Sequence, residues 1–141
     1  MVSILDFRYE DSAVLHVLPP GGSEPIATIE FAGPAHEKTR SQAQWLYAQS
    51  QRISIRLSQG QRSPRTLDEA ERENVKVIVG RMLGWDGIKR RDDAGKAVEV
   101  PFSEESATEM LLNPALGWLF EQCFAFLGND HNFLPRRLTA H

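Results

Sequence analysis

The sequence has few of the residues from which catalytic or metal sites are built. It contains one cysteine, Cys123, among 141 residues, so neither an intrachain disulfide nor a thiolate metal cluster is expected. Burial beside Phe120 and Phe124 would raise the pKa of this thiol, which is the opposite of what a cysteine nucleophile needs. None of the four histidines has a second ligand at metal-site spacing. We therefore expect no catalytic residues, no metal site and no cofactor, and we predict that the chain is not an enzyme.

Long apolar runs and an excess of basic charge are also missing. No stretch approaches the ~20 apolar residues of a membrane-spanning helix, and residues 1–9 do not have the pattern of a signal peptide. The net charge is −3, whereas phosphate binding needs a basic surface. The one basic run, Lys89-Arg90-Arg91, is followed directly by Asp92 and Asp93. We expect neither nucleic acid nor a membrane as partner, and a single thiol suits the reducing cytoplasm.

The composition is that of an ordinary globular domain. Hydrophobic residues make up 41% and charged residues 25% of the chain, which is close to the average for soluble domains. A chain of 141 residues suits one domain and can bury a core without disulfides or metals. We predict a single domain over residues 1–135 and a tail over residues 136–141.

The apolar pattern predicts an α+β, mainly helical fold. Two short β-branched segments flank the turn signal Pro19-Pro20-Gly21-Gly22, which predicts an N-terminal β-hairpin over residues 12–32. A second short hairpin is predicted over residues 86–100, with its turn near Asp93 to Gly95. Thr66 and Glu69 have the spacing of a capping box, and Gly84 is the expected stop of the helix that follows. The predicted helices are residues about 36–58, about 67–83, about 104–112 and about 114–127. The predicted core-facing stripe of the second is Ala70, Asn74, Val77, Ile78 and Met82.

The last predicted helix has the most regular apolar stripe, made of Leu116, Leu119, Phe120, Cys123, Phe124 and Leu127. Trp118 and Phe126 lie on a neighbouring face with Gln122 between them, and Phe133 and Leu134 follow the helix. These apolar side chains either widen the core face of the helix or form an exposed patch for a partner helix. The candidate partner-binding residues are Trp118, Gln122, Phe126, Phe133 and Leu134.

Several short motifs follow one another in a characteristic order. They are Glu73-Asn74, Gly84-Trp85, Val100-Pro101-Phe102-Ser103-Glu104-Glu105, Leu112-Asn113-Pro114, Trp118-Leu119 and Asn132-Phe133-Leu134. This succession resembles the tail assembly chaperones of long-tailed phages and prophages, and residues 29–39 are similar to the opening of the same proteins. The resemblance is strongest over residues 66–135, and the order and spacing of the motifs matter more than any one of them.

The resemblance implies a helper protein that binds the long helical tape measure protein, keeps it soluble and promotes assembly of the tail tube around it. The tail tube protein is a further implied partner. Such a chaperone acts in the host bacterial cytoplasm and is not expected in the mature virion. Linked weak sites capture a long client more effectively, so we expect a homo-oligomer with the helix over 114–127 or the N-terminal hairpin at the contact. The alternatives are a virion structural protein of the terminator or connector type, a protein-binding module with no phage connection, and a small enzyme that uses Cys123.

Overall fold

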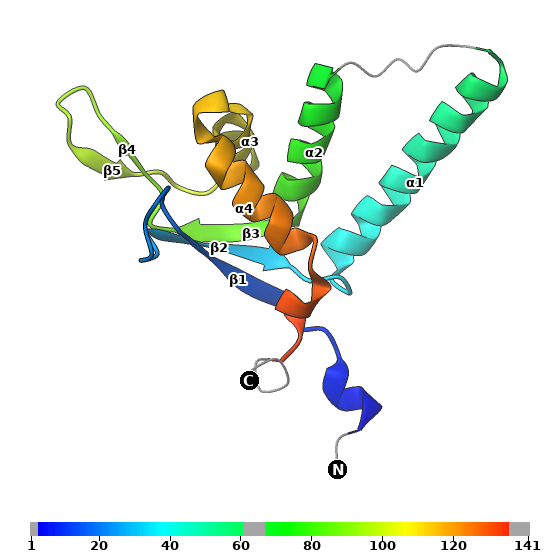
Figure 1. Ribbon diagram of the computed structural model, residues 1–141, viewed down its shortest axis with the longest axis horizontal. Helices are drawn as coiled ribbons and strands as arrows, with labels where there is room; N and C mark the ends of the chain where they lie inside the picture. Colours follow the sequence, from blue (N-terminus) through cyan, green and yellow to red (C-terminus); the bar gives the residue numbers. More distant parts are fainter. Residues whose placement is uncertain (1–2, 61–66, 136–141) are drawn as a thin grey trace.

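The computed structural model describes residues 3–60 and 67–135, without the side chains of residues 53, 54, 56 and 57. Thr66 of the predicted capping box and the predicted tail over residues 136–141 lie outside this range. The predicted α+β class is confirmed (Figure 1). The helices are α1 (Glu37–Ser58), α2 (Leu67–Arg81), α3 (Glu104–Leu112) and α4 (Gly117–Leu127), with short 3-10 helices at Ile4–Phe7 (η1), Pro114–Leu116 (η2) and Asp130–Phe133 (η3); the strands are β1 (Ser12–Val17), β2 (Ala27–Ala32), β3 (Met82–Asp86), β4 (Lys89–Arg91) and β5 (Ala97–Glu99).

The main sheet is antiparallel, with strand order β1-β2-β3. Leu15 of β1 pairs with Ile29 of β2, which in turn pairs with Trp85 of β3. These side chains point to the face that α2, α3 and α4 cover (Figure 1). His16 and Glu30 point to the other face and are exposed. The alternation along β1 and β2 therefore produces one buried and one exposed face, as expected for an antiparallel sheet packed on one side only.

The boundary between α2 and β3 differs from the prediction of a helix over 67–83. The helix ends at Arg81, and Met82 begins the third strand of the sheet. Met82 pairs with Phe31 of β2 and is fully buried there, so long-range pairing overrides the local helical periodicity. The buried stripe of α2 also differs, because Asn74 is exposed and Val75 is buried instead. The buried residues that α2 contributes to the core are Val75, Ile78 and Val79.

The predicted second hairpin is confirmed, although its strands, β4 and β5, have only three residues each. The carboxylate of Asp92 accepts backbone hydrogen bonds from Ala94 (3.0 Å) and Lys96 (2.8 Å), and Gly95 has a φ of 79°. The Trp85 indole N–H donates to the carbonyl of Val100 at 2.8 Å. This bond ties the base of the hairpin to the main sheet.

Arg81 connects the end of α2 to two other parts of the chain, and it is the only buried charged side chain among the described residues. Its guanidinium donates to the carbonyl of Ala32 from Nε (3.1 Å) and Nη2 (2.8 Å), and lies 5.3 Å from the ring centre of Phe133. Burial lowers the pKa of this guanidinium, and the charge of Asp130 acts in the opposite direction. The Phe133 carbonyl accepts a backbone hydrogen bond from Glu10 at 2.6 Å. Arg81 and Phe133 thus hold β2, η3 and the segment before β1 together.

α3 and α4 meet at a sharp angle. Asn113 caps η2 by accepting a hydrogen bond from Ala115 N–H at 3.0 Å, and Pro114 follows at the first helical position, where proline is favoured. Within the described ranges no single helix is long and apolar enough to cross a membrane; Glu104–Leu112 and Pro114–Leu127 reach that length and composition only as a pair, which is bent by 86°.

Candidate partner-binding site

Phe126 and Phe133, two of the predicted partner-binding residues, belong to the core. The Phe126 ring lies 5.7 Å from the ring of Phe31 and 5.5 Å from that of Phe133, measured between centroids. Phe133 is fully buried, so it offers no surface to a partner in this fold. Phe126 and Phe133 therefore widen the core and do not form an exposed patch for a partner helix.

The other predicted residues also make contacts within the domain. Trp118 is half-buried against the core. The Gln122 amide accepts from the backbone N–H of Leu18 (3.0 Å) and donates to its carbonyl (2.7 Å), which fixes the end of β1 to α4. Leu134 is half-buried, and its N–H donates to the His131 carbonyl at 3.1 Å. The five predicted residues therefore form no continuous exposed patch.

Phe124 corrects the predicted core stripe of the last helix. It was expected to be buried, but its side chain is 56% exposed, and its ring stacks on Phe120 with centroids 5.9 Å apart. The rest of the predicted stripe does contact the core: Leu119 and Cys123 are buried, and Leu116, Phe120 and Leu127 pack against it. The core face of α4 therefore extends to Phe126 and not to Phe124.

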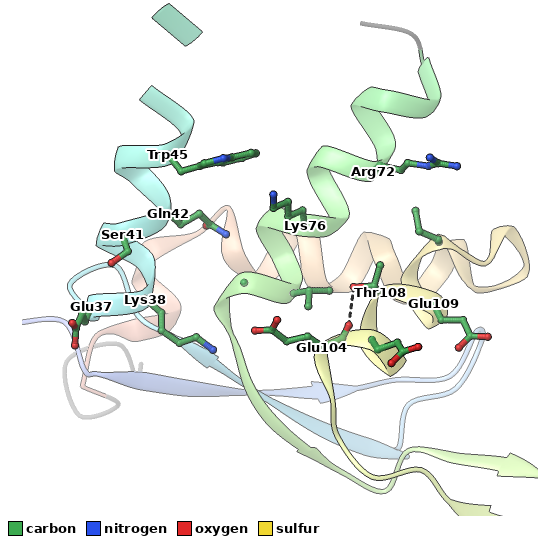
Figure 2. A pocket seen from close by; sticks show the side chains of 14 residues that line it. Glu37, Lys38, Ser41, Gln42, Trp45, Arg72, Lys76, Glu104, Thr108 and Glu109 are labelled. Carbon is green, nitrogen blue, oxygen red and sulfur yellow. Dashed lines mark hydrogen bonds between the residues drawn. The ribbon is translucent and has the colours of Figure 1, made fainter. Parts of the chain in front are cut away.

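The structure reveals a different candidate site, an open cleft between α1, α2 and α3 (Figure 2). Its volume is about 1250 Å³. Trp45 of α1, Val79 of α2 and Leu112 of α3 provide its apolar surface. The remaining residues of the cleft are polar or small: Glu37, Lys38, Ser41, Gln42, Arg72, Lys76, Gly80, Glu104, Glu105, Thr108 and Glu109.

The first turns of α1 are attached to α2 by side chains at the base of this cleft. Gln42 donates from Nε2 to the Val77 carbonyl at 2.8 Å. A Cβ at position 80 would lie 2.5 Å from that same Nε2 atom, so only glycine leaves room for this hydrogen bond. Lys38 donates from Nζ to the Met82 carbonyl at 3.3 Å, close to the point where α2 passes into β3.

Trp45 lies at the end of the part of α1 that is attached to α2. The ammonium of Lys76 lies 4.3 Å from the centre of the Trp45 ring, a favourable cation–π distance, and Figure 2 shows the two side chains facing each other across the gap between α1 and α2. Beyond Trp45, α1 diverges from α2 and projects from the body of the molecule (Figure 1). Tyr47 and Ile55 on this projecting part are exposed. Apolar surface is therefore left uncovered both in the cleft and along α1.

The charges in the cleft are unevenly distributed. Glu104, Glu105 and Glu109 come from α3, whereas Arg72 and Lys76 come from α2. The α3 wall is therefore acidic and the α2 wall basic. The Thr108 hydroxyl donates to the backbone carbonyl of Glu104 at 2.7 Å, so it is occupied within α3.

Groups suited to binding a metal ion are not brought together in the described part of the chain. Among the described residues, no set of three or more His, Cys, Asp or Glu side chains could hold a metal ion. Cys123 is buried in the core, and burial raises the pKa of its thiol to about 12, which confirms the predicted direction. The cleft combines apolar side chains from all three helices with an acidic and a basic wall, an arrangement suited to binding a polypeptide.

Sequence reasoning missed this cleft because its walls come from three helices that are separated along the chain. The usable signal was Trp45, a large apolar residue on a mostly polar predicted helix, which needs a partner to cover it. Comparisons with protein families, with curated proteins and with solved structures find no match to this chain. The cleft and the sequence resemblance are therefore the grounds on which a function is proposed.

Proposed function

We propose that the protein is a tail assembly chaperone of a long-tailed phage or prophage. In this role it binds the tape measure protein in the host cytoplasm, keeps it soluble and promotes tail tube assembly around it. The structural observation that supports the proposal is the open cleft between α1, α2 and α3, with Trp45 and Leu112 at its surface. The order of sequence motifs that resembles the tail assembly chaperones supports it independently.

A long helical client has an apolar stripe that must be kept from water before its final partner assembles around it. Burying about three large apolar side chains of such a client contributes roughly 5–9 kcal/mol. Association itself costs about 4–15 kcal/mol, so one cleft of this kind binds weakly. Weak binding suits a helper that must later release its client.

Several copies acting together offset this weakness, because linked sites raise the effective concentration of the client. We therefore propose a homo-oligomer, with the tail tube protein as a second partner during assembly. The N-terminal segment supports self-association, since Ile4 is 88% exposed and Leu5 and Phe7 are also exposed. Apolar side chains concentrated in one short segment are typical of interaction surfaces.

The proposal is tested by co-expressing this chain with the very long helix-rich protein encoded in the same gene cluster. We expect a soluble complex that forms only when this chain is present. Leu112→Asp should reduce the yield of complex, because it places a charge in the cleft. Val98→Asp is the matched control, since Val98 lies on β5 outside the cleft and is 37% exposed against 39% for Leu112.

A client that stays insoluble while this chain is folded and alone in the supernatant would contradict the chaperone role. The virion structural alternative then becomes the better hypothesis. Mass spectrometry of purified particles distinguishes the two, because a structural subunit remains in the virion and an assembly chaperone does not.

A further inference from the structure

The dimensions of the cleft favour one class of occupant. An α-helix about 10 Å wide with a pitch of 5.4 Å encloses roughly 420 Å³ per turn, so a cleft of about 1250 Å³ has room for roughly three turns. Small-molecule pockets are mostly about 300–1,000 Å³ and enclose their ligands. This cleft is larger, lies open between α1 and α2 (Figure 2), and has Trp45 and Leu112 at its surface. A helix of another polypeptide fits it better than a small molecule.

The acidic wall of the cleft indicates the charge of that helix. Glu104 and Glu105 occupy the first turn of α3, where the helix dipole alone favours carboxylates. Glu109 lies beyond the first turn, where the dipole provides little stabilisation. No described residue forms an ion pair with these three glutamates, so their carboxylates remain available to a basic partner.

Two of the three cations that line the cleft, Lys38 and Lys76, already have contacts within the domain, whereas Arg72 lies higher on α2. Lys76 lies over the Trp45 ring at 4.3 Å, and Lys38 donates to the Met82 carbonyl at 3.3 Å. Because of these contacts, the ammonium group of either lysine is less available for an ion pair with an acidic partner. The electrostatic preference of the cleft is therefore set mainly by the glutamates of α3.

We infer that the cleft binds an amphipathic α-helix whose apolar stripe contacts Trp45 and Leu112 and whose lysine- or arginine-rich edge faces Glu104, Glu105 and Glu109. This inference rests on the proposed function, and it specifies which segments of a helical client are captured. Each exposed ion pair changes affinity by a factor of roughly 1.5 to 5. A basic edge that meets all three glutamates should strengthen binding roughly tenfold, and salt should weaken this preference.

The test uses synthetic helical peptides of about 18 residues, or roughly five turns, with one shared leucine stripe. One edge carries lysine in the first peptide, glutamine in the second and glutamate in the third. Fluorescence anisotropy of labelled peptides with the full chain should show the lysine peptide binding about tenfold more tightly than the glutamine peptide. The glutamate peptide should bind most weakly, and the differences should shrink between about 50 mM and about 500 mM salt.

A charge reversal within the cleft provides the decisive comparison. Glu105→Lys with Glu109→Lys should reverse the order of the lysine and glutamate peptides. The control is Glu99→Lys with Glu121→Lys, which makes the same change in net charge at exposed positions that do not line the cleft. The control should keep the original order, because a general attraction of basic peptides to an acidic protein would respond to both pairs alike. Circular dichroism confirms that each variant is folded.

Equal binding of the three peptides, or the same change in both double variants, would overturn the inference. The co-expression test would stand unaffected, since a client could then be captured without charge selection. Charge-selective peptide binding together with failed client capture would have the opposite meaning: the cleft would bind basic helices, but the chaperone proposal would fall.

Discussion

At the scale of single residues, α4 places two phenylalanines of similar sequence context in opposite environments. Phe126 packs against Phe31 and Phe133, whereas Phe124 is 56% exposed. We expect Phe126→Ala to lower the free energy of unfolding by about 2–3 kcal/mol, somewhat less than for a fully buried phenylalanine. Phe124→Ala on the same helix should cost less than about 1 kcal/mol. Urea denaturation of both variants tests this, and equal losses would contradict the burial of Phe126.

Cys123 provides a second prediction at this scale. Burial raises the pKa of its thiol from 9.0 to about 12, and the thiolate is the reactive form. At about pH 8 this difference lowers the thiolate fraction about 1,000-fold, so we expect iodoacetamide to modify the folded protein more slowly than the unfolded chain by about that factor. Mass spectrometry with and without denaturant measures the two rates, and rapid modification of the folded protein would contradict the burial.

The raised pKa of the Cys123 thiol also affects the stability of the protein at high pH. The fold favours the protonated thiol, so the contribution of Cys123 is fully present below about pH 9 and is lost as the pH rises toward about 12. Cys123→Ala should remove this part of the alkaline destabilisation. The test is to compare the melting temperatures of the unaltered chain and the Cys123→Ala variant between about pH 9 and about pH 12.

At the scale of elements, the attachment of α1 to α2 depends on Gly80 and Gln42. Gly80→Ala should gain about 1 kcal/mol from helix propensity and lose about 1 kcal/mol by displacing the Gln42–Val77 hydrogen bond. We therefore expect little net change in the free energy of unfolding. Amide hydrogen exchange in α1 should nevertheless become faster, because the helix is held less firmly.

A double-mutant cycle separates these two effects. In a Gln42→Ala background the hydrogen bond is already gone, so Gly80→Ala should stabilise the protein by about 1 kcal/mol. Urea denaturation of the four proteins of the cycle measures the coupling free energy between positions 42 and 80. Strictly additive effects would mean that Gly80 does not act through Gln42.

At the scale of the whole molecule, the fold leaves several large apolar side chains exposed to solvent. Ile4 and Phe7 of η1 are exposed, as are Tyr47 and Ile55 on the projecting part of α1. We expect the protein to self-associate, and Ile4→Asp with Phe7→Asp to shift it toward monomer. Light scattering across a concentration series measures this, with Val98→Asp as the control for adding charge at an exposed apolar position. A monodisperse monomer of the unaltered chain at high micromolar concentration would contradict the expectation.

Much of the local structure could be predicted from the sequence. The predicted helix over residues 36–58 agrees with α1 to within one residue, and α3 begins directly after Ser103, which caps it by accepting a hydrogen bond from Ser106 N–H. The N-terminal hairpin is also where its turn signal placed it. Caps, prolines and turn residues act within one or two turns of chain, so the sequence carries these signals by itself.

Only the tertiary structure decided which apolar residues are buried and where a partner could bind. Met82 became part of a strand because β2 lies beside it, and Phe126 rather than Phe124 became core because Phe31 and Phe133 lie on that side of α4. The cleft at Trp45 likewise exists only because α2 and α3 pack together while α1 diverges. Local sequence determines whether a segment is helical, but its buried face depends on neighbours that are distant along the chain.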